Sequence, residues 1–202
     1  PDIILATETW LDKEINTSEL PLDDFQVFRK DRQDNTEGGG VLIAVHKNFI
    51  CIEEPELDTD CEVIWAKLDI VGSKTLHLGA YYRKPGSKAD KLDNLNTSLS
   101  RISGDGSTIW LGRDFNLPDI DWSVPCFNNN TEVKHYTKAL HEQLLGIAAD
   151  HGLEQVVDKP TRGHHTLDLF FTNNPSTINR VETMPPVSDH DTVFIEADTK
   201  PM

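Results

Sequence analysis

The sequence predicts a mixed α and β domain in which antiparallel strands make up much of the sheet. Three observations lead to this prediction. Short apolar runs rich in β-branched residues recur along the chain, two longer segments repeat apolar residues at helical spacing, and one pair of apolar runs is separated by a short glycine-containing turn. The length of 202 residues fits one domain spanning residues 1–202, because no shift in composition marks a boundary.

Eight apolar runs predict strands, because each is bounded by Gly, Pro, Asn or Asp. They are Ile3–Ala6, Gln26–Phe28, Val41–Val45, Val63–Ile70, Thr75–Tyr82, Thr108–Leu111, Leu167–Thr172 and Thr192–Ala197. The turn at Gly72 and Ser73, between the fourth and fifth runs, predicts a β-hairpin. The three glycines at positions 38–40 predict a flexible turn rather than a phosphate-binding loop, because no Lys-Ser/Thr pair follows them.

Two segments, Lys88–Ile102 and Val133–His151, predict amphipathic helices. Their apolar residues recur at spacings of three and four, and the second segment ends directly before Gly152, a residue typical of helix C-termini. The apolar stripes consist of Leu92, Leu95, Leu99 and Ile102 in the first segment, and of Leu140, Leu144, Leu145 and Ala148 in the second.

The chain is acidic, with 34 Asp and Glu against 19 Lys and Arg and a net charge of −15. Its pI is about 4.8. Proteins that bind nucleic acid gain affinity by neutralising phosphates with Lys and Arg, so tight binding that is independent of DNA sequence is not expected. A locally basic face, or a metal ion that offsets the carboxylates, would still allow the chain to act on DNA.

The three cysteines are scattered and form no CxxC pair, which predicts reduced thiols in an intracellular protein rather than a zinc site or a disulfide framework. No apolar run is long enough to span a bilayer, so no membrane partner is expected.

Polar residues follow two of the predicted strands. Glu8 comes after the first run, where a carboxylate is well placed to hold a hard cation, although most glutamates are solvated surface residues. Asp114 and Asn116 come after the run that ends at Leu111, and on an extended chain they share a face opposite Phe115. A carboxylate and an amide in this arrangement can orient a water or a phosphate oxygen, but they also fit an Asx turn.

Two further polar segments lie within and before predicted strands. Asp168 interrupts an otherwise apolar run; because an unpaired buried carboxylate is costly, it either caps a structural feature or has a partner such as a histidine. His190 lies between Asp189 and Asp191, which favour its protonated form. Together the four segments provide metal ligands, a water-orienting pair and a His–Asp pair, the groups required for metal-assisted phosphodiester hydrolysis.

These segments belong to longer stretches that resemble the endonuclease/exonuclease/phosphatase superfamily, and within it the apurinic/apyrimidinic endonuclease-like domain of non-LTR retrotransposons. The stretches are PDIILATETWL, GGGVLIAVHKNF, LGAYYRKP, WLGRDFNLPDIDW, DKPTRGHHTLDLFFTNNP and VSDHD, and their order and spacing match over nearly the whole chain. The resemblance implies a four-layered α/β/β/α sandwich with two central mixed sheets, which agrees with the mixed composition of strands and helices above.

The resemblance also implies roles for the residues near the metal and the scissile phosphate. Glu8 matches the principal ligand of Mg²⁺, which Mn²⁺ can replace. Tyr82 matches the tyrosine that contacts the scissile phosphate, whereas Tyr81 is expected to point into the core. Asp114 and Asn116 match the pair that orients and activates the attacking water.

Asp168 matches the acid that holds the catalytic imidazole of His190, which stabilises phosphate charge or transfers a proton. Asp189 is implied to assist the metal or the water, and Ser188 to be a supporting phosphate contact. Four cationic residues flank the site, where they either contact the DNA backbone or form ordinary surface charge. They are Arg83, Lys84, Lys159 and Arg162.

The implied function is that of a Mg²⁺-dependent endonuclease that nicks target DNA for retrotransposition. DNA would be the substrate, the nucleus the place of action, and a reverse transcriptase would follow in the same polyprotein. Two alternatives remain: an inactive, repurposed domain that binds a protein partner, or a phosphatase or RNase on the same scaffold. The complete set of matching site residues argues against an inactive copy, and the stretch LPDIDW resembles retrotransposon sequences rather than phosphatases.

The chain departs from the family at two places. Family members normally begin with a further strand and helix, and that strand supplies an asparagine near the metal. This chain starts at Pro1, so we expect an N-terminally truncated domain with an exposed sheet edge. Arg113 replaces a small residue; on alternating geometry it points away from the metal, and it needs a partner if it is buried.

Overall fold

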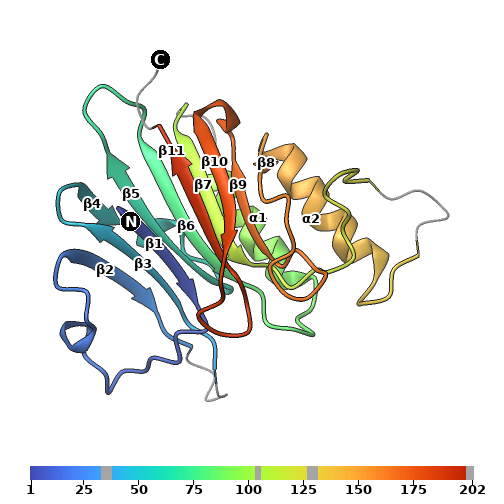
Figure 1. Cartoon of the computed structure of the whole chain (residues 1–202), viewed down its shortest axis with the longest axis horizontal. Coiled ribbons are helices and arrows are strands. Elements are labelled where there is room, and N and C mark those ends of the chain that lie inside the picture. Colours follow the sequence, from blue (N-terminus) through green and yellow to red (C-terminus); the bar gives the residue numbers. More distant parts are fainter. Residues whose placement is uncertain (33–37, 103–105, 127–131, 199–202) are drawn as a thin grey trace.

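The computed structural model describes residues 1–32, 38–102, 106–126 and 132–198. Its strands form three sheets, one of which is covered by two α-helices (Figure 1). In chain order the strands are β1 (Ile3–Thr7), β2 (Phe25–Lys30), β3 (Val41–His46), β4 (Ile50–Glu53), β5 (Glu62–Asp69), β6 (Leu76–Tyr82), β7 (Thr108–Asp114), β8 (Glu154–Gln155), β9 (Asp168–Thr172), β10 (Ile178–Met184) and β11 (Thr192–Ala197). The helices are α1 (Asp90–Ile102) and α2 (Lys138–Asp150), and short 3-10 turns are η1 (Thr17–Glu19), η2 (Pro55–Leu57) and η3 (Pro175–Thr177).

A six-stranded mixed sheet, in the order β4-β5-β6-β7-β9-β8, forms the centre of the fold. β6 and β7 are parallel and are connected through α1, whereas the other neighbouring strands are antiparallel. β5 and β6 form the predicted hairpin, and Ser73 N donates to Ile70 O at 3.0 Å across its turn. The carboxyl ends of β6 and β7 therefore lie at the same edge of the sheet.

The central sheet is buried on both faces because its side chains alternate between two apolar clusters. On β5, Val63 and Trp65 pack on the side of α1 and α2, while Ile64 and Ala66 face the opposite layer. All four are at most 2% exposed. Burial on both faces explains why the sequence of this strand alternates only in part.

The layer opposite the helices consists of two separate antiparallel sheets, β1-β3-β2 and β10-β11 (Figure 1). Within the described residues β1 pairs only with β3 and β11 only with β10, so each keeps an unpaired edge. Both strands pack apolar side chains on the central sheet, among them Leu5 and Ile195, which remain partly exposed. The predicted mixed α/β class with a central mixed sheet is confirmed.

All eight predicted strands are present, and three short or solvent-facing strands, β4, β8 and β10, were not predicted. The second helix begins at Lys138, five residues after the predicted start at Val133, because Thr137 caps it: Thr137 Oγ1 accepts a hydrogen bond from Leu140 N at 3.3 Å. The first helix begins at Asp90 rather than Lys88. In the part of the chain that the structure describes, neither helix is long and apolar enough to cross a membrane.

Candidate active site

Four of the polar segments meet at one edge of the sheets. Tyr82 and Asp114 end the parallel strands β6 and β7, and Asp168 begins β9, which runs antiparallel to β7. Asp168 lies directly opposite Asp114 in the strand register. Glu8 directly follows β1, which packs over β6 and β7, and His190 precedes β11. The topology thus brings together residues that are up to 182 positions apart in the sequence, from Glu8 to His190.

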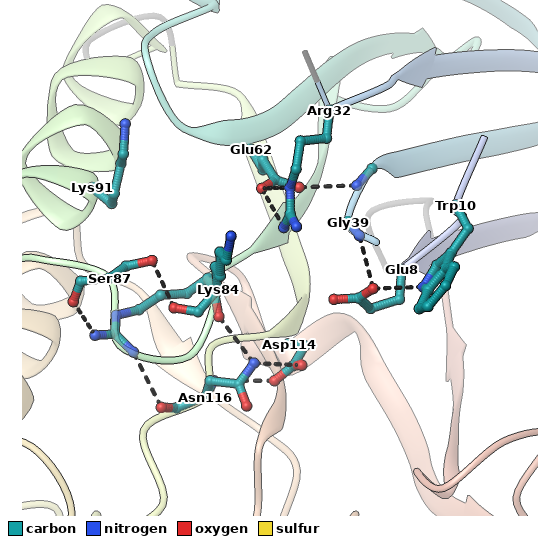
Figure 2. Close-up of polar contacts among 12 residues, drawn as sticks. Glu8, Trp10, Arg32, Gly39, Glu62, Lys84, Ser87, Lys91, Asp114 and Asn116 are labelled. Carbon is teal, nitrogen blue, oxygen red and sulfur yellow. Dashed lines mark hydrogen bonds and ion pairs between the residues drawn. The ribbon is translucent and has the colours of Figure 1, made fainter. Parts of the chain in front are cut away.

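Asp114 and Asn116 form one buried unit at the end of β7 (Figure 2). Asn116 Nδ2 donates to Asp114 Oδ2 at 2.7 Å and to Arg83 O at 2.9 Å, and Asn116 N donates to Asp114 Oδ1 at 3.1 Å. Phe115 is fully buried in the cluster on the helical side, which leaves the two polar side chains on the other side, as expected. Asn116 has a φ of 50°, so the polypeptide turns sharply directly after the carboxylate.

Asp168 and His190 form the predicted His–Asp pair. His190 Nδ1 lies 2.7 Å from Asp168 Oδ2, and Asp168 is 2% exposed. Thr161, which is also buried, accepts hydrogen bonds at Oγ1 from Leu167 N and Asp168 N, so the backbone at the start of β9 is held in place. Of the two explanations for a lone Asp in an apolar strand, a histidine partner is the one that the structure bears out.

The carboxylates and the imidazole influence one another's ionisation. Burial, followed by the charge of Asp168, raises the pKa of Asp114 to about 7, against the opposing effects of His190 and Asn116. The hydrogen bond to Asp168 raises the pKa of His190 above its usual value, although desolvation opposes it. Near neutral pH, Asp114 can therefore accept or release a proton beside a positively charged imidazole, which is what a general base next to a phosphate requires.

Glu8 is exposed and is oriented by three donors. Its Oε2 accepts hydrogen bonds from Gly39 N and from Trp10 Nε1, both at 2.8 Å, while the other carboxylate oxygen points toward the side on which Asp114 lies (Figure 2). Desolvation raises the pKa of Glu8, but hydrogen bonds from Gly39, Tyr82 and Trp10 outweigh it, and the pKa is lowered overall. The Glu8 side chain is thus kept ionised with one oxygen not engaged by Gly39 or Trp10.

Arg32 and Glu62 extend this network, and no sequence pattern indicated their role. Glu62 Oε1 accepts a hydrogen bond from Arg32 Nε at 2.9 Å and lies 2.7 Å from Arg32 Nη2 in an ion pair, and Glu62 Oε2 accepts a hydrogen bond from Gly40 N at 2.9 Å. The Arg32 guanidinium also lies 5.5 Å from the centre of the Tyr82 ring. The pair therefore links Tyr82 to the glycine turn that orients Glu8. A local sequence signal does exist, the three glycines at 38–40, but it identifies only the turn.

The expected contact between Arg83 and the DNA backbone does not agree with the structure. Arg83 is 1% exposed, and its guanidinium donates to Asn116 O at 3.3 Å and to Ser87 O at 2.7 Å. The ring of Tyr136 lies 4.8 Å from the guanidinium. A long cation was interpreted as a surface group, but here backbone carbonyls and an aromatic ring stabilise it inside the protein. Arg83 supports the position of Asn116 instead.

We expect Arg83→Met to lower the free energy of unfolding by about 1–3 kcal/mol, because it leaves buried carbonyl groups without a donor. Lys88→Met, which removes an exposed cation from the same loop, should change it by less than about 0.5 kcal/mol. Urea unfolding of the three proteins measures both values. If Arg83→Met unfolds like the wild type but binds DNA more weakly, the original surface assignment would be correct.

Arg162 and Asp189 pair with each other at the rim of the site. Arg162 Nη2 lies 2.6 Å from Asp189 Oδ2, and the two side chains are 49% and 66% exposed. Ser188, which precedes Asp189, and Lys159, which lies in the segment before Arg162, are both exposed. The roles predicted for these residues in binding phosphate or metal therefore require Arg162 and Asp189 to exchange their mutual contact for a ligand.

Arg113 is partly exposed with a φ of 97°, and its Nε is buried without a hydrogen-bond partner among the described residues.

The comparison with protein families finds one match. The family described as endonuclease-reverse transcriptase matches residues 76–194, which is more than half of the chain and includes Tyr82, Asp114, Asp168 and His190. No curated protein sequence matches the chain at a significant level.

Several solved structures share the fold. The endonuclease domain of TRAS1, a telomere-specific non-LTR retrotransposon, is 17% identical with a TM-score of 0.72 and is matched over 99% of this chain and 87% of that one. The AP endonuclease LMAP from Leishmania major is 14% identical with a TM-score of 0.71, over 96% and 78%. The catalytic domain of Xenopus laevis APE2 is 13% identical with a TM-score of 0.72, over 100% and 85%. At these identities the likeness establishes the fold alone.

Proposed function

The chain belongs to the endonuclease–reverse transcriptase family, and on this premise we propose that it is a Mg²⁺-dependent endonuclease that hydrolyses phosphodiester bonds in DNA. The observation that carries the proposal is the pair of buried units at one sheet edge, Asp114 with Asn116 and Asp168 with His190. Two buried carboxylates in register beside an imidazole are costly for stability, and a catalytic role accounts for that cost.

A magnesium ion fits the exposed carboxylate of Glu8. Mg²⁺ typically takes only one or two carboxylates from the protein and keeps waters or phosphate oxygens as its other ligands. Glu8 offers one oriented, ionised carboxylate, whereas no group of three or more His, Cys, Asp or Glu side chains suited to a metal occurs in the residues that the structure describes. Glu8 would hold the ion, with Asp189 as the second candidate once it leaves Arg162. Bound there, the ion would offset phosphate charge.

The chain's own residues would then perform the remaining steps. Asp114, with a pKa of about 7, is suited to take the proton from a water that Asn116 helps to orient. Protonated His190, held by Asp168, and the Tyr82 hydroxyl, once it turns from Glu8, would donate hydrogen bonds to the phosphate oxygens as negative charge develops. Partial burial and the neighbouring Glu8 raise the pKa of Tyr82, so its hydroxyl stays protonated and remains a donor.

The experiment that tests this proposal is nicking of supercoiled plasmid by the wild-type chain with Mg²⁺, with EDTA, and by His190→Ala. We expect relaxation that requires Mg²⁺ and is lost in the variant. A folded wild-type chain that nicks no plasmid would contradict the proposal. Parallel assays with RNA and with a phosphomonoester distinguish DNA cleavage from an RNase or a phosphatase on the same scaffold.

We extend the proposal to the setting in which the chain acts. The family description and the likeness to the TRAS1 domain support an origin in a non-LTR retrotransposon. In that setting the chain would nick target DNA in the nucleus, and a reverse transcriptase in the same polyprotein would use the nicked strand. Expression of the chain joined to a reverse transcriptase, followed by sequencing of new insertions, would test this part separately from cleavage.

Gly38 provides a test of metal binding that does not depend on catalysis. A Cβ at Gly38 would lie 2.9 Å from Glu8 Oε2, and Gly38 has a φ of +82°. Gly72 has nearly the same φ, +80°, but no atom lies within 4 Å of its Cβ position. We therefore expect Gly38→Ala to weaken Mn²⁺ binding by about tenfold, because it displaces the ligand, whereas Gly72→Ala should bind Mn²⁺ like the wild type.

Both alanine variants carry similar backbone strain, of about 1–2 kcal/mol, so a difference between them reports on Glu8 rather than on the turn conformation. Electron paramagnetic resonance of free Mn²⁺ measures the affinity directly. Equal affinities in the two variants would show that Glu8 is not the ligand.

A further inference from the structure

Trp10 is exposed and yet held firmly beside Glu8. Its side chain is 65% exposed, the highest value for an aromatic residue in the part of the chain that the structure describes. Its indole Nε1 donates to Glu8 Oε2 at 2.8 Å, and its backbone N donates to Gly39 O at 3.1 Å. The ring also lies against Gly38, where a Cβ would approach Trp10 Cε2 to 3.5 Å. A single exposed apolar side chain is ordinary in a protein. Trp10 differs because two hydrogen bonds and packing against Gly38 hold it in one position.

The backbone at this position is strained as well. Trp10 has a φ of 54°, in the left-handed region that bulky residues rarely adopt, and Glu8 has a φ of 52°. Conformations of this kind cost free energy and cluster at ligand-binding sites. The indole, bonded to Glu8 Oε2, lies on the outer side of Glu8, which is the side away from Asp114, so that Glu8 lies between Trp10 and the candidate catalytic carboxylate (Figure 2).

The arginines around the site are engaged within the protein, so they contribute little to binding the phosphates of a substrate. Arg83 is buried against main-chain carbonyls, Arg32 is paired with Glu62, and Arg162 is paired with Asp189. The whole chain carries a net charge of −15, so general attraction to phosphates is weak. Of the four cations expected beside the site, Lys84 and Lys159 are exposed, but two lysines offset little of this net charge. A substrate of high negative charge therefore gains part of its binding free energy from contacts that do not depend on charge. Stacking of nucleobases on an aromatic ring is such a contact.

We propose that Trp10 is a stacking platform for an unpaired nucleobase next to the scissile phosphate, a role that rests on the proposed endonuclease function. When a phosphate lies at Glu8, the adjoining nucleotide reaches the outer side of Glu8, where the indole presents its exposed surface. The Nε1–Glu8 hydrogen bond fixes the ring relative to the phosphate position. The platform selects DNA that is single-stranded or locally unpaired at the cut site.

Two variants separate stacking from the hydrogen bond to Glu8. Trp10→Phe keeps an aromatic face but loses the N–H donor, whereas Trp10→Leu loses both. Binding is measured in EDTA with a fluorescein-labelled single-stranded oligonucleotide and with the matching duplex. We expect Trp10→Leu to bind the single strand at least about fivefold more weakly, and Trp10→Phe to retain most of the affinity. Ile50→Ser, which removes an apolar side chain that is 76% exposed on β4, should bind like the wild type.

Intrinsic fluorescence provides a readout that activity does not. Trp65 and Trp110 are buried and Trp122 is partly buried, so iodide should quench Trp10 preferentially. The single strand should protect that fluorescence from iodide in the wild type, and the protected component should be missing in Trp10→Phe.

Single-strand affinity of Trp10→Leu equal to that of the wild type would overturn the platform. So would equal weakening by Trp10→Leu and Trp10→Phe, which would assign Trp10 only to holding Glu8. If the wild-type chain nicks plasmid and the variants show either of these results, only the platform inference is wrong and the proposed function stands. If the wild-type chain neither binds nor cuts DNA, both the proposed function and the platform inference are wrong.

Discussion

Asp168→Asn should reduce the rate of plasmid nicking at neutral pH by about 100- to 10,000-fold, the range for loss of an acid–base group, while the chain remains folded. Asp168 accepts from His190 Nδ1 at 2.7 Å and is 2% exposed, and its hydrogen bond is the largest of the effects that raise the pKa of His190, ahead of the charges of Asp114 and Asp189. An asparagine fits the same space but carries no charge, and the imidazolium then loses its main stabilising partner. Single-turnover nicking with excess enzyme measures the effect on the chemical step.

The pH dependence of the nicking rate also tests the Asp168–His190 pair, because a purely structural role of the pair would leave the pH profile unchanged. Activity needs ionised Asp114 and protonated His190, so the rate of the wild type should rise with pH through about 7 and fall again above the raised pKa of His190. In Asp168→Asn, Asp114 loses a repelling charge and His190 loses its principal stabilising bond. Both limbs of the pH profile should therefore move to lower pH.

The same shifts predict how stability changes with pH. The His190 pKa is raised, so the stabilisation from its pairing is fully present below pH 6.5, the ordinary value, and is lost as pH rises through the folded pKa. Asp114 has a pKa of about 7 against an ordinary 3.8, so its ionisation costs stability increasingly as pH rises from 3.8 to about 7. Both effects lower the melting temperature toward alkaline pH, and Asp168→Asn should show a shallower dependence.

Asp158→Asn is a suitable control, because Asp158 is an exposed aspartate in the segment that leads to β9. It should leave nicking, the pH profile and the melting curve unchanged. If Asp168→Asn cuts plasmid within about threefold of the wild type, a factor far below that of an acid–base group, the His–Asp pair is structural rather than catalytic.

The parts of the fold that the sequence predicted are those with a strong local pattern. The first and third strands are continuous apolar runs, and the leucines of α1 recur at helical spacing, because these segments bury their side chains in the two main clusters. Asp168 was also interpretable, since a carboxylate inside an apolar strand requires a partner. In these cases one segment carries enough information by itself.

The unpredicted strands lack that pattern because solvent covers much of them. On β10 only three of seven residues are even partly buried, and on β4 only Cys51 is buried. Their backbone pairing with β11 and β5 determines the conformation, and that pairing is non-local. The buried position of Arg83 was missed for a similar reason, because one of its two carbonyl partners, Asn116 O, becomes a neighbour only after β6 and β7 have paired.

The Arg32–Glu62 pair is the most consequential of these non-local features, and its removal should have the second large effect. We expect Arg32→Met to lower the free energy of unfolding by about 2 kcal/mol, less than a fully buried pair would cost, because the Glu62 side chain is 23% exposed. It should also weaken Mn²⁺ binding by about 10- to 100-fold, the range for residues that orient a metal ligand. Glu62 holds Gly40 N, and the neighbouring Gly39 N holds Glu8, so the loss reaches the metal ligand through two adjacent peptide groups.

A double-mutant cycle with Glu62→Gln assigns the effect to the pair. Glutamine can still accept from Gly40 N but needs no cation, so the double variant should recover part of the stability that Arg32→Met loses. Arg180→Met removes another arginine paired with glutamates, but its side chain is 52% exposed, so it should change stability by less than about 0.5 kcal/mol. If Arg32→Met behaves like Arg180→Met in urea unfolding and in Mn²⁺ binding, the glycine turn at residues 38–40 positions Glu8 without the Arg32–Glu62 pair.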